Sequence, residues 1–578
     1  DVLSKDDFEK IDETVIYLTK NCFLKYHESL KFNGVFLQEL IEHELFSFLL
    51  QQFLKPQIIF NILKKYDIAS LCDFTIYGSF IKNLINDDVV YSNFKSSDDP
   101  SFYHDNIIFK VPIGNNPIHL EISRKNFTKI KKSLQKTTDI LYNLKPNIEK
   151  KNNLLLVNFD VIEFEDLLKS LNKLNVNYLL LNTRKPAITG KKSLRIIKNS
   201  NSKIINLYDF HKKTINEIKI ATKSLNDTHE NMKNDDNFFE THFSINSTTF
   251  WSCIKESFFK TCFSRFNESL ERIFLLKQFF DEYDISLNFL WVDVGQEEKE
   301  CIMMGKQFSI ESIMIQHGRF QTSKVWDKFA SYIGQFPAPM LSDKQIVWGE
   351  MTKKYALSFN HPEKNIIVGG SPRHDKFFNY EKNTSSTGKI VLATTGTMFL
   401  SSDTCTATSQ IRYDEFIKKI YHIVKTIPGK ELVIKSHPSQ ILRKMVQDLI
   451  DELDPSINVI ENTNNYELFS DCDMVITFNN STICLEAISQ GTPVISLQTE
   501  SWAMDDDIVQ NNAIVSISKL SDCEKFIKKI LNDKEFKNSL IKNGTHFLSQ
   551  YMSNQSNASF TVATILKNLI NKNNEKVP

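Results

Sequence analysis

The sequence lacks an excess of either charge. In a chain of 578 residues, 70 Lys and Arg residues are balanced by 70 Asp and Glu residues, and the isoelectric point is about 7.3. Proteins that bind nucleic acid usually carry a basic excess. We therefore expect no nucleic-acid partner.

Long apolar runs are also missing. The most apolar early segment, Phe32–Leu54, is interrupted by three glutamates and a histidine, whereas a membrane-spanning helix needs roughly 18 or more apolar residues in a row. The chain begins on Asp1 with an acidic run, which is not typical of a secretory signal. We expect no transmembrane segment and a cytoplasmic protein, in the cytosol or at the inner face of the cell membrane.

The nine cysteines are scattered and form neither a C-x-x-C motif nor a Cys/His cluster at metal-ligand spacing. This usage is typical of a reducing compartment. It predicts no metal site.

The length suggests about three domains. The first 70 residues show helical periodicity, for example at Leu37, Leu40, Ile41 and Leu45. Short β-like runs follow, at 74–77, 106–113 and 118–122, and Lys145–Asn153 has the composition of a linker. Residues 1–150 are therefore predicted to be a helical and small α/β accessory module.

From residue 151, predicted strands and helices alternate. The strands are Leu154–Phe159, Tyr178–Leu181, Phe289–Val294, Ser312–Gln316 and Ile366–Val368; the helices are Glu163–Leu174 and Glu297–Lys306, with a long helical insert around 209–284. The β-α-β rhythm predicts a parallel sheet with helices on both faces, forming a first Rossmann-like domain over 151–375.

A second series of this kind predicts another Rossmann-like domain over 376–578. Its strands are Ile390–Thr394, Leu432–Lys435, Ile457–Ile460, Met474–Thr477 and Pro493–Leu497; its helices are Tyr413–Lys425, Gln440–Leu453 and Thr482–Gln490. Ligands of such sheets bind beyond the carboxyl ends of the strands. We therefore expect the active site in a cleft between the two doubly wound α/β domains.

Two candidate general bases follow strands of the first domain. His317 comes after Ile315-Gln316 and precedes Gly318, a position that faces such a cleft. Asp293, in the predicted strand Phe289–Val294, is the competing candidate. A lone histidine is more often structural, so this alternative stays open.

The segment Gly369-Gly370-Ser371-Pro372-Arg373-His374-Asp375 follows another apolar strand. It is either a hinge turn or an anion site, in which Arg373 and backbone N–H groups around Gly370 lie close to a phosphate.

Two segments of the second domain have the residue types of a phosphate site. Lys435-Ser436-His437-Pro438 offers two cationic donors after a strand, although an exposed turn is the simpler alternative. Asn480-Ser481-Thr482 follows an apolar strand and opens a helix, where it either caps the helix or also binds an anion. Glu486, one turn later, is placed to reach a ribose hydroxyl.

This order of motifs resembles the HP and SS/ST motifs of GT-B-fold enzymes that use cytidine nucleotides: bacterial sialyltransferases, capsular Kdo transferases and CDP-glycerol glycerophosphotransferases. Asn480–Ala487 with Gly491–Val494 looks most like the capsular Kdo transferases, and Gly370–Asp375 is similar to the G-x-P-R-x-D of the glycerophosphotransferases. The resemblance covers roughly residues 150 to 560.

The resemblance implies a donor pocket in the second domain, with His437, Ser481 and Thr482 around phosphate and cytidine, and an acceptor side carrying His317. Where glycerophosphotransferases have a Pro-Thr-aromatic-Arg run, this chain has Ala393-Thr394-Thr395-Gly396-Thr397, with Thr395 as a candidate donor-binding residue. The implied enzyme is a glycosyltransferase that moves a Kdo- or sialic-acid-like sugar from a CMP-activated donor to a surface-glycan or lipid-linked acceptor. It would use neither a metal nor a cofactor.

Three other functions remain open. A CDP-glycerol-type glycerophosphotransferase and an enzyme like UDP-GlcNAc 2-epimerase share the architecture. A degenerate GT-B scaffold that binds a partner through its helical region is the non-catalytic alternative. The joint presence of His317, His437, Ser481 and Glu486 favours an enzyme.

Overall fold

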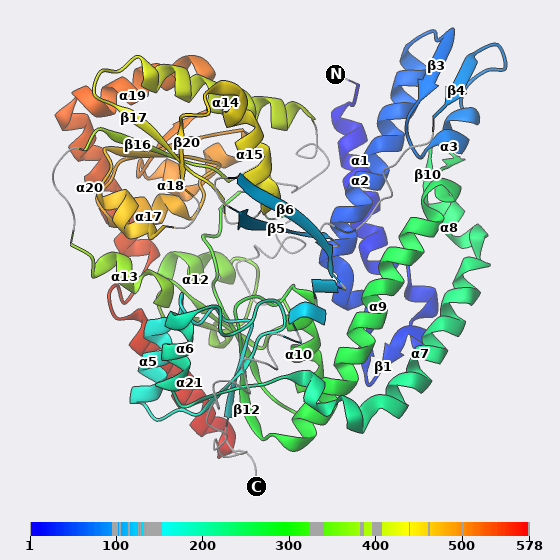
Figure 1. Cartoon of the computed structure of the whole chain (residues 1–578), viewed down its shortest axis with the longest axis horizontal. Helices are drawn as coiled ribbons and strands as arrows, with labels where there is room; N and C mark the ends of the chain where they lie inside the picture. The colour runs from blue at the N-terminus through cyan, green and yellow to red at the C-terminus, as the bar shows by residue number, and fades with distance from the viewer. Residues whose placement is uncertain are drawn as a thin grey trace.

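The computed structural model places two α/β layers one above the other, with a long helical arm beside them (Figure 1). It describes residues 2–94, 102, 106–113, 116–124, 126–127, 129–131, 133, 153–323, 327, 340–381, 387–395, 407–437, 440–460, 463–499 and 501–575. No helix within these ranges is both long and apolar enough to cross a membrane.

The first layer is a seven-stranded parallel sheet with the order β15-β14-β13-β12-β7-β8-β9. Its strands are β7 (Asn153–Val157), β8 (Tyr178–Leu181), β9 (Ser202–Ile204), β12 (Ile285–Leu290), β13 (Ser312–Ile315), β14 (Lys344–Val347) and β15 (Ile366–Val368). Its helices include α5 (Glu165–Lys173), α6 (Lys191–Lys198), α10 (Gln296–Gln307), α12 (Glu350–Leu357) and α13 (Asp375–Phe378). Every residue of β7, β8, β12 and β13 is buried, as expected for strands covered on both faces.

The second layer is a six-stranded parallel sheet with the order β18-β17-β16-β19-β20-β21. Its strands are β16 (Lys389–Ala393), β17 (Glu431–Lys435), β18 (Asn458–Ile460), β19 (Met474–Phe478), β20 (Val494–Leu497) and β21 (Val515–Ile517). Its helices are α14 (Ala407–Lys425), α15 (Gln440–Leu453), α16 (Asn465–Ser470), α17 (Ile483–Ser489), α18 (Asp507–Gln510), α19 (Cys523–Asn532) and α20 (Lys534–Tyr551). The predicted fold class, a GT-B-like pair of doubly wound α/β domains with an α-rich N-terminal region, is confirmed.

The last helix, α21 (Ala558–Asn574), returns to the first layer. It packs against α5 and β12, and its apolar face is buried in the core of the seven-stranded sheet. The red helix beside α5 in Figure 1 shows this return. The division into domains at residue 375 stays a prediction. Helix α21 follows this boundary in the sequence but packs with the first layer.

The helical arm combines two separate parts of the chain. Helices α1 (Lys5–Asn21) and α2 (Leu37–Lys65) pack beside α7 (His211–Lys233), α8 (Asp236–His242) and α9 (Trp251–Glu282), and all five bury side chains in one core. The N-terminal region and the predicted helical insert therefore form one packed unit. The small strands β3 (Ser70–Asp73) and β4 (Val90–Asn93), with α3 (Gly78–Lys82) between them, lie at its tip, and β5 (Asn106–Ile113) and β6 (Asn116–Ser123) form a hairpin.

Several predicted boundaries were wrong. The run 74–77 is not a strand, because Asp73 accepts hydrogen bonds from the N–H and hydroxyl of Thr75 and so closes a turn there. The strand predicted at Phe289–Val294 begins earlier and ends at Leu290, because the polar residues Ser286 and Asn288 are buried within it. Residues 145–152 of the predicted linker lie outside the described residues, and Asn153 begins β7.

Candidate active site

A buried ion pair joins the loop that follows β13 to the segment that follows β20. Arg319 pairs with Asp506, with 2.6 Å between Nη1 and Oδ2, and also donates to the carbonyl oxygen of Asn480 at 3.1 Å. The backbone N–H of Arg319 donates to Thr482 Oγ1 at 3.0 Å. Both charged side chains are almost completely buried. The carboxyl-end loops of the two sheets are thus fixed against each other.

The predicted anion-binding residue Asn480 takes part in this junction. Its Nδ2 donates to the carbonyl oxygen of Ala503 at 2.6 Å and to Asp506 at 3.1 Å, and its Oδ1 accepts from Gln498 at 2.8 Å. Its backbone is left-handed, with φ of 54°, a region that asparagine tolerates. These bonds make Asn480 structural, whereas the neighbouring Ser481 is half-buried and accepts a long bond of 3.4 Å from the N–H of Ile483.

Arg373 lies between the two layers. Its Nε is 3.1 Å from Glu163 Oε1, which precedes α5, and its Nη2 is 3.5 Å from Glu486 Oε1 on α17. Its Nη1 donates to the carbonyl oxygen of His317 at 3.0 Å, and its guanidinium lies 5.8 Å from the centre of the Trp291 ring. A quarter of the side chain remains exposed. Arg373 therefore presents a positive charge where loops from both sheets meet.

Glu486 is buried and compensates part of that charge. Oε2 accepts from Asn465 at 2.7 Å, and Oε1 lies 3.6 Å from Nε2 of His374. Burial alone would raise the pKa of Glu486, but the contacts with His374 and Arg373 outweigh it and hold this pKa below its ordinary value. Burial lowers the pKa of His374, whose Nδ1 is 2.6 Å from Ser371 Oγ.

His317 lies beside Arg373, whose Nη1 donates to its carbonyl oxygen. Its ring is half-buried, and none of the described residues forms a hydrogen bond with its buried Nδ1. Burial and the charge of Arg373 lower the pKa of His317 to about 4. The imidazole is therefore neutral at physiological pH and has a ring nitrogen available for a ligand.

The structure gives Asp293 a different role from the one proposed for it. Asp293 follows β12 by three residues, and its Oδ2 accepts the backbone N–H groups of Met340, Leu341 and Ser342 at 2.8 to 3.1 Å. A carboxylate oxygen engaged by three backbone donors anchors a loop. We therefore carry His317 forward as the candidate base.

Gly370 is a turn residue. Its φ is +87°, and a Cβ on it would lie 2.5 Å from the carbonyl oxygen of Ser553. The N–H groups of Gly369 and Gly370 both donate to the carbonyl oxygen of Val347, at 3.0 and 3.3 Å. They are occupied within the protein, so of this segment Arg373, and not Gly370, is the candidate anion-binding group.

The remaining predicted residues lie on the carboxyl edge of the second sheet. Lys435 ends β17, Thr395 follows β16, and β16 pairs with both β17 and β19. Lys435 is buried, with Nζ donating to the carbonyl oxygen of Ser436 at 2.9 Å. Burial and the charge of Lys435 lower the pKa of His437. With about 4.8 Å between neighbouring strands, the ends of β17 and β19 lie roughly 10 Å apart, on either side of Thr395.

Sequence reasoning missed several members of the site. Glu163, Trp291, Arg319 and Asp506 carry no local signal, because their partners come from distant parts of the chain. His374 stood within a segment that the sequence had singled out. Among the described residues, no group of three or more His, Cys, Asp or Glu side chains is arranged to hold a metal ion.

The sequence matches no protein-family model and no curated protein. Several solved structures are similar at low identity. They include S. aureus MnaA with UDP (11% identity, TM-score 0.45, covering 72% of this chain and 97% of that one). A UDP-GlcNAc 2-epimerase from Neisseria meningitidis bound to UDP-GlcNAc is 12% identical (TM-score 0.44, 72% and 99% covered). Anabaena HepE with UDP and glucose is 9% identical (TM-score 0.40, 72% and 99% covered).

Proposed function

We propose that the chain transfers a sugar from a nucleotide-activated donor to a hydroxyl group of an acceptor, at the site formed by Arg373 and His317. The observation that carries this proposal is the position of Arg373. It contacts Glu163 of the first layer and Glu486 of the second, remains partly exposed, and lies against His317.

These two residues supply the groups that the reaction needs. The acceptor oxygen attacks the anomeric carbon of the sugar, and the bond from that carbon to the phosphate oxygen breaks with its electron pair leaving on the phosphate. A ring nitrogen of His317 takes the proton of the acceptor hydroxyl. The Arg373 guanidinium stabilises the charge on the departing phosphate. A bound phosphate raises the pKa of His317, because its negative charge favours the protonated ring, and so makes it a stronger base.

For the donor we propose a cytidine nucleotide along the edge formed by Lys435, Thr395, His437 and Ser481, carrying a Kdo- or sialic-acid-like sugar. Lys435 and His437 at the end of a strand can both donate hydrogen bonds to a phosphate. The choice of cytidine depends on the resemblance of His437-Pro438 and Ser481-Thr482 to enzymes that use it. The acceptor would be a surface glycan or a lipid-linked precursor of one.

The test incubates the purified chain with CMP-N-acetylneuraminate or with CMP-Kdo and measures the release of CMP by chromatography. We expect release with at least one donor, and a loss of about a hundredfold or more in turnover in His317→Gln, as for removal of an acid–base group. Asp293→Asn is the matched control and should stay close to wild type. Release of CMP from CDP-glycerol or epimerisation of UDP-GlcNAc, with no reaction of either CMP-sugar, would refute the proposal in favour of one of the alternatives.

A further inference from the structure

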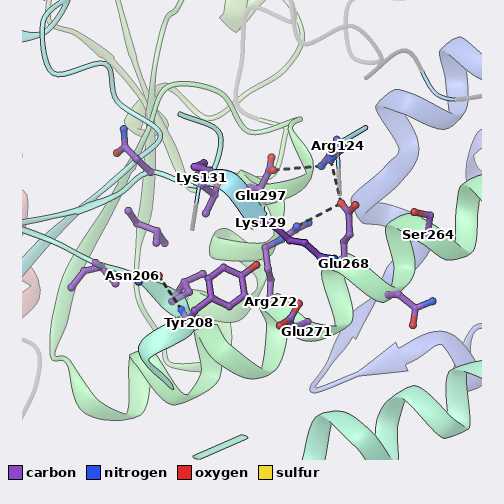
Figure 2. Close-up of a pocket in the computed structure, with 16 residues that line it drawn as sticks. Arg124, Lys129, Lys131, Asn206, Tyr208, Ser264, Glu268, Glu271, Arg272 and Glu297 are labelled. Carbon is purple, nitrogen blue, oxygen red and sulfur yellow. Dashed lines mark hydrogen bonds and ion pairs between the residues drawn. The ribbon is translucent and has the colours of Figure 1, made fainter. Parts of the chain in front are cut away.

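A cavity lies on the first sheet, away from Arg373. It has a volume of about 510 Å³ and is enclosed by the carboxyl ends of β8 and β9, the middle of α9 and the segment around Arg124 and Lys129. We call it the α9 pocket. Its size falls within the roughly 300–1,000 Å³ typical of small-molecule sites. Figure 2 shows Tyr208, Glu271, Arg272 and Lys129 around the space.

The two arginines of the α9 pocket are paired with carboxylates. Arg124 lies 3.2 Å from Glu268 and 3.6 Å from Glu297, and Arg272 lies 3.8 Å from Glu268 and pairs with Glu300 beneath. The dashed lines between Arg124 and its two partners in Figure 2 follow these contacts. A phosphate or carboxylate would have to compete with these carboxylates for the guanidinium groups. The pocket therefore fits an uncharged ligand with many polar groups better than an anion.

One buried acceptor points to hydroxyl groups on that ligand. Asn182, just after β8, is 7% exposed and lines both the α9 pocket and an adjoining cavity of about 250 Å³. Its Nδ2 donates to the carbonyl oxygen of Phe159 at 2.9 Å, which fixes the orientation of the amide. No described residue donates to its Oδ1. A buried carbonyl oxygen of this kind accepts a hydrogen bond from a donor outside the chain, such as a sugar hydroxyl or a water molecule.

The adjoining cavity leads toward the candidate active site. It is lined by Trp291 and Glu163, and both contact Arg373. A glycan with one sugar unit in the α9 pocket would extend past Asn182 and Trp291, and the unit at its end would reach Arg373.

We propose that the α9 pocket binds an uncharged sugar unit of the acceptor glycan, at a distance from the unit that reacts. This inference depends on the proposed function. The Tyr208 ring gives the apolar surface on which a sugar ring packs, and Asn182, Asn267 and Glu271 give polar groups for its hydroxyls. The α9 pocket is lined by α9, which belongs to the helical insert, and by Arg124 and Lys129 of the N-terminal region. In this proposal, the insert and the N-terminal region both take part in acceptor binding.

The experiment uses the full chain on an array of neutral and acidic glycans, followed by calorimetric titration of the strongest neutral ligand. We expect neutral glycans to bind, with affinity at least tenfold weaker in Asn182→Leu and in Glu271→Ala. Asn216→Leu, on the exposed face of α7, is the control for Asn182→Leu. Glu271 is a third exposed, so its variant folds even if the buried one does not.

Binding of acidic glycans alone, binding unaffected by both pocket variants, or no glycan binding at all would each overturn the proposal. CMP titrations on the same samples separate it from the proposed function. Normal nucleotide binding without glycan binding refutes the α9 pocket alone, whereas glycan binding at the α9 pocket without nucleotide binding refutes the nucleotide-dependent transfer.

Discussion

At the scale of single residues, the protonation of His317 gives a pH dependence of stability. Its folded pKa of about 4 lies below the ordinary value of 6.5, so between these values the unfolded chain holds a proton that the folded chain does not. The neutral His317 therefore contributes on the order of 3 kcal/mol to the free energy of unfolding. This contribution is fully present above about pH 6.5 and is lost as the pH falls to 4. His374 and His437 act in the same direction.

Comparison with His317→Gln isolates this residue. Unfolding in urea at pH 7.5 and pH 4.5 should show a smaller loss of stability on acidification in the variant than in the wild type. An equal loss in both proteins would mean that His317 titrates normally and is not held neutral by burial and by the charge of Arg373.

His437 gives a prediction for ligand binding. A hydrogen bond from His437 to the phosphate of the nucleotide should contribute about 1.5 to 3 kcal/mol to the free energy of binding. His437→Ala should therefore weaken CMP binding by roughly ten- to a hundredfold. Calorimetric titration measures this, with His422→Ala on the exposed face of α14 as the control. Equal CMP affinity in wild type and His437→Ala would remove the residue from the site.

At the scale of elements, α21 depends on a cap from elsewhere in the chain. The Asp375 carboxylate accepts the N–H groups of Ala558 and Ser559 at 3.0 and 2.7 Å. Asp375→Ala should cost about 1 to 2 kcal/mol of unfolding free energy, and Asp375→Asn about half of that because it keeps one acceptor. Denaturant unfolding of the three proteins checks the order. An unchanged midpoint in Asp375→Ala would show that the cap is unimportant.

Elements with a continuous apolar run or a clear helical period could be predicted from the sequence. The bounds of β8, β15 and α15 match the prediction residue for residue, since burial on both faces or a clear helical period leaves one interpretation. The predicted bounds of β12 were shifted, because its buried polar residues Ser286 and Asn288 have the composition of a loop. Residues of the site were predicted where they stand at the end of such a strand or in the first turn of the helix after it, as for His317, Lys435 and Glu486. Glu163 and Asp506 act through contacts between distant segments, which the sequence does not show.

At the scale of the whole molecule, the Arg319–Asp506 pair joins the two layers. Removal of one partner leaves an uncompensated buried charge, so Arg319→Met should destabilise the protein by about 3 to 5 kcal/mol. The double variant Arg319→Met/Asp506→Leu should recover a large part of this loss, because it buries no charge. Additive losses in a double-mutant cycle of unfolding free energies would show that the two side chains do not interact.

The central claim is that the paired sheets bind a nucleotide with its phosphate at Arg373. Calorimetric titration of the wild type and of Arg373→Met with CMP, and with UMP for comparison, tests it most directly. We predict one CMP per chain, weaker binding of UMP, and a loss of roughly tenfold or more in CMP affinity when the guanidinium is removed. No binding of either nucleotide by the folded wild type, or an affinity unchanged by Arg373→Met, would contradict the account.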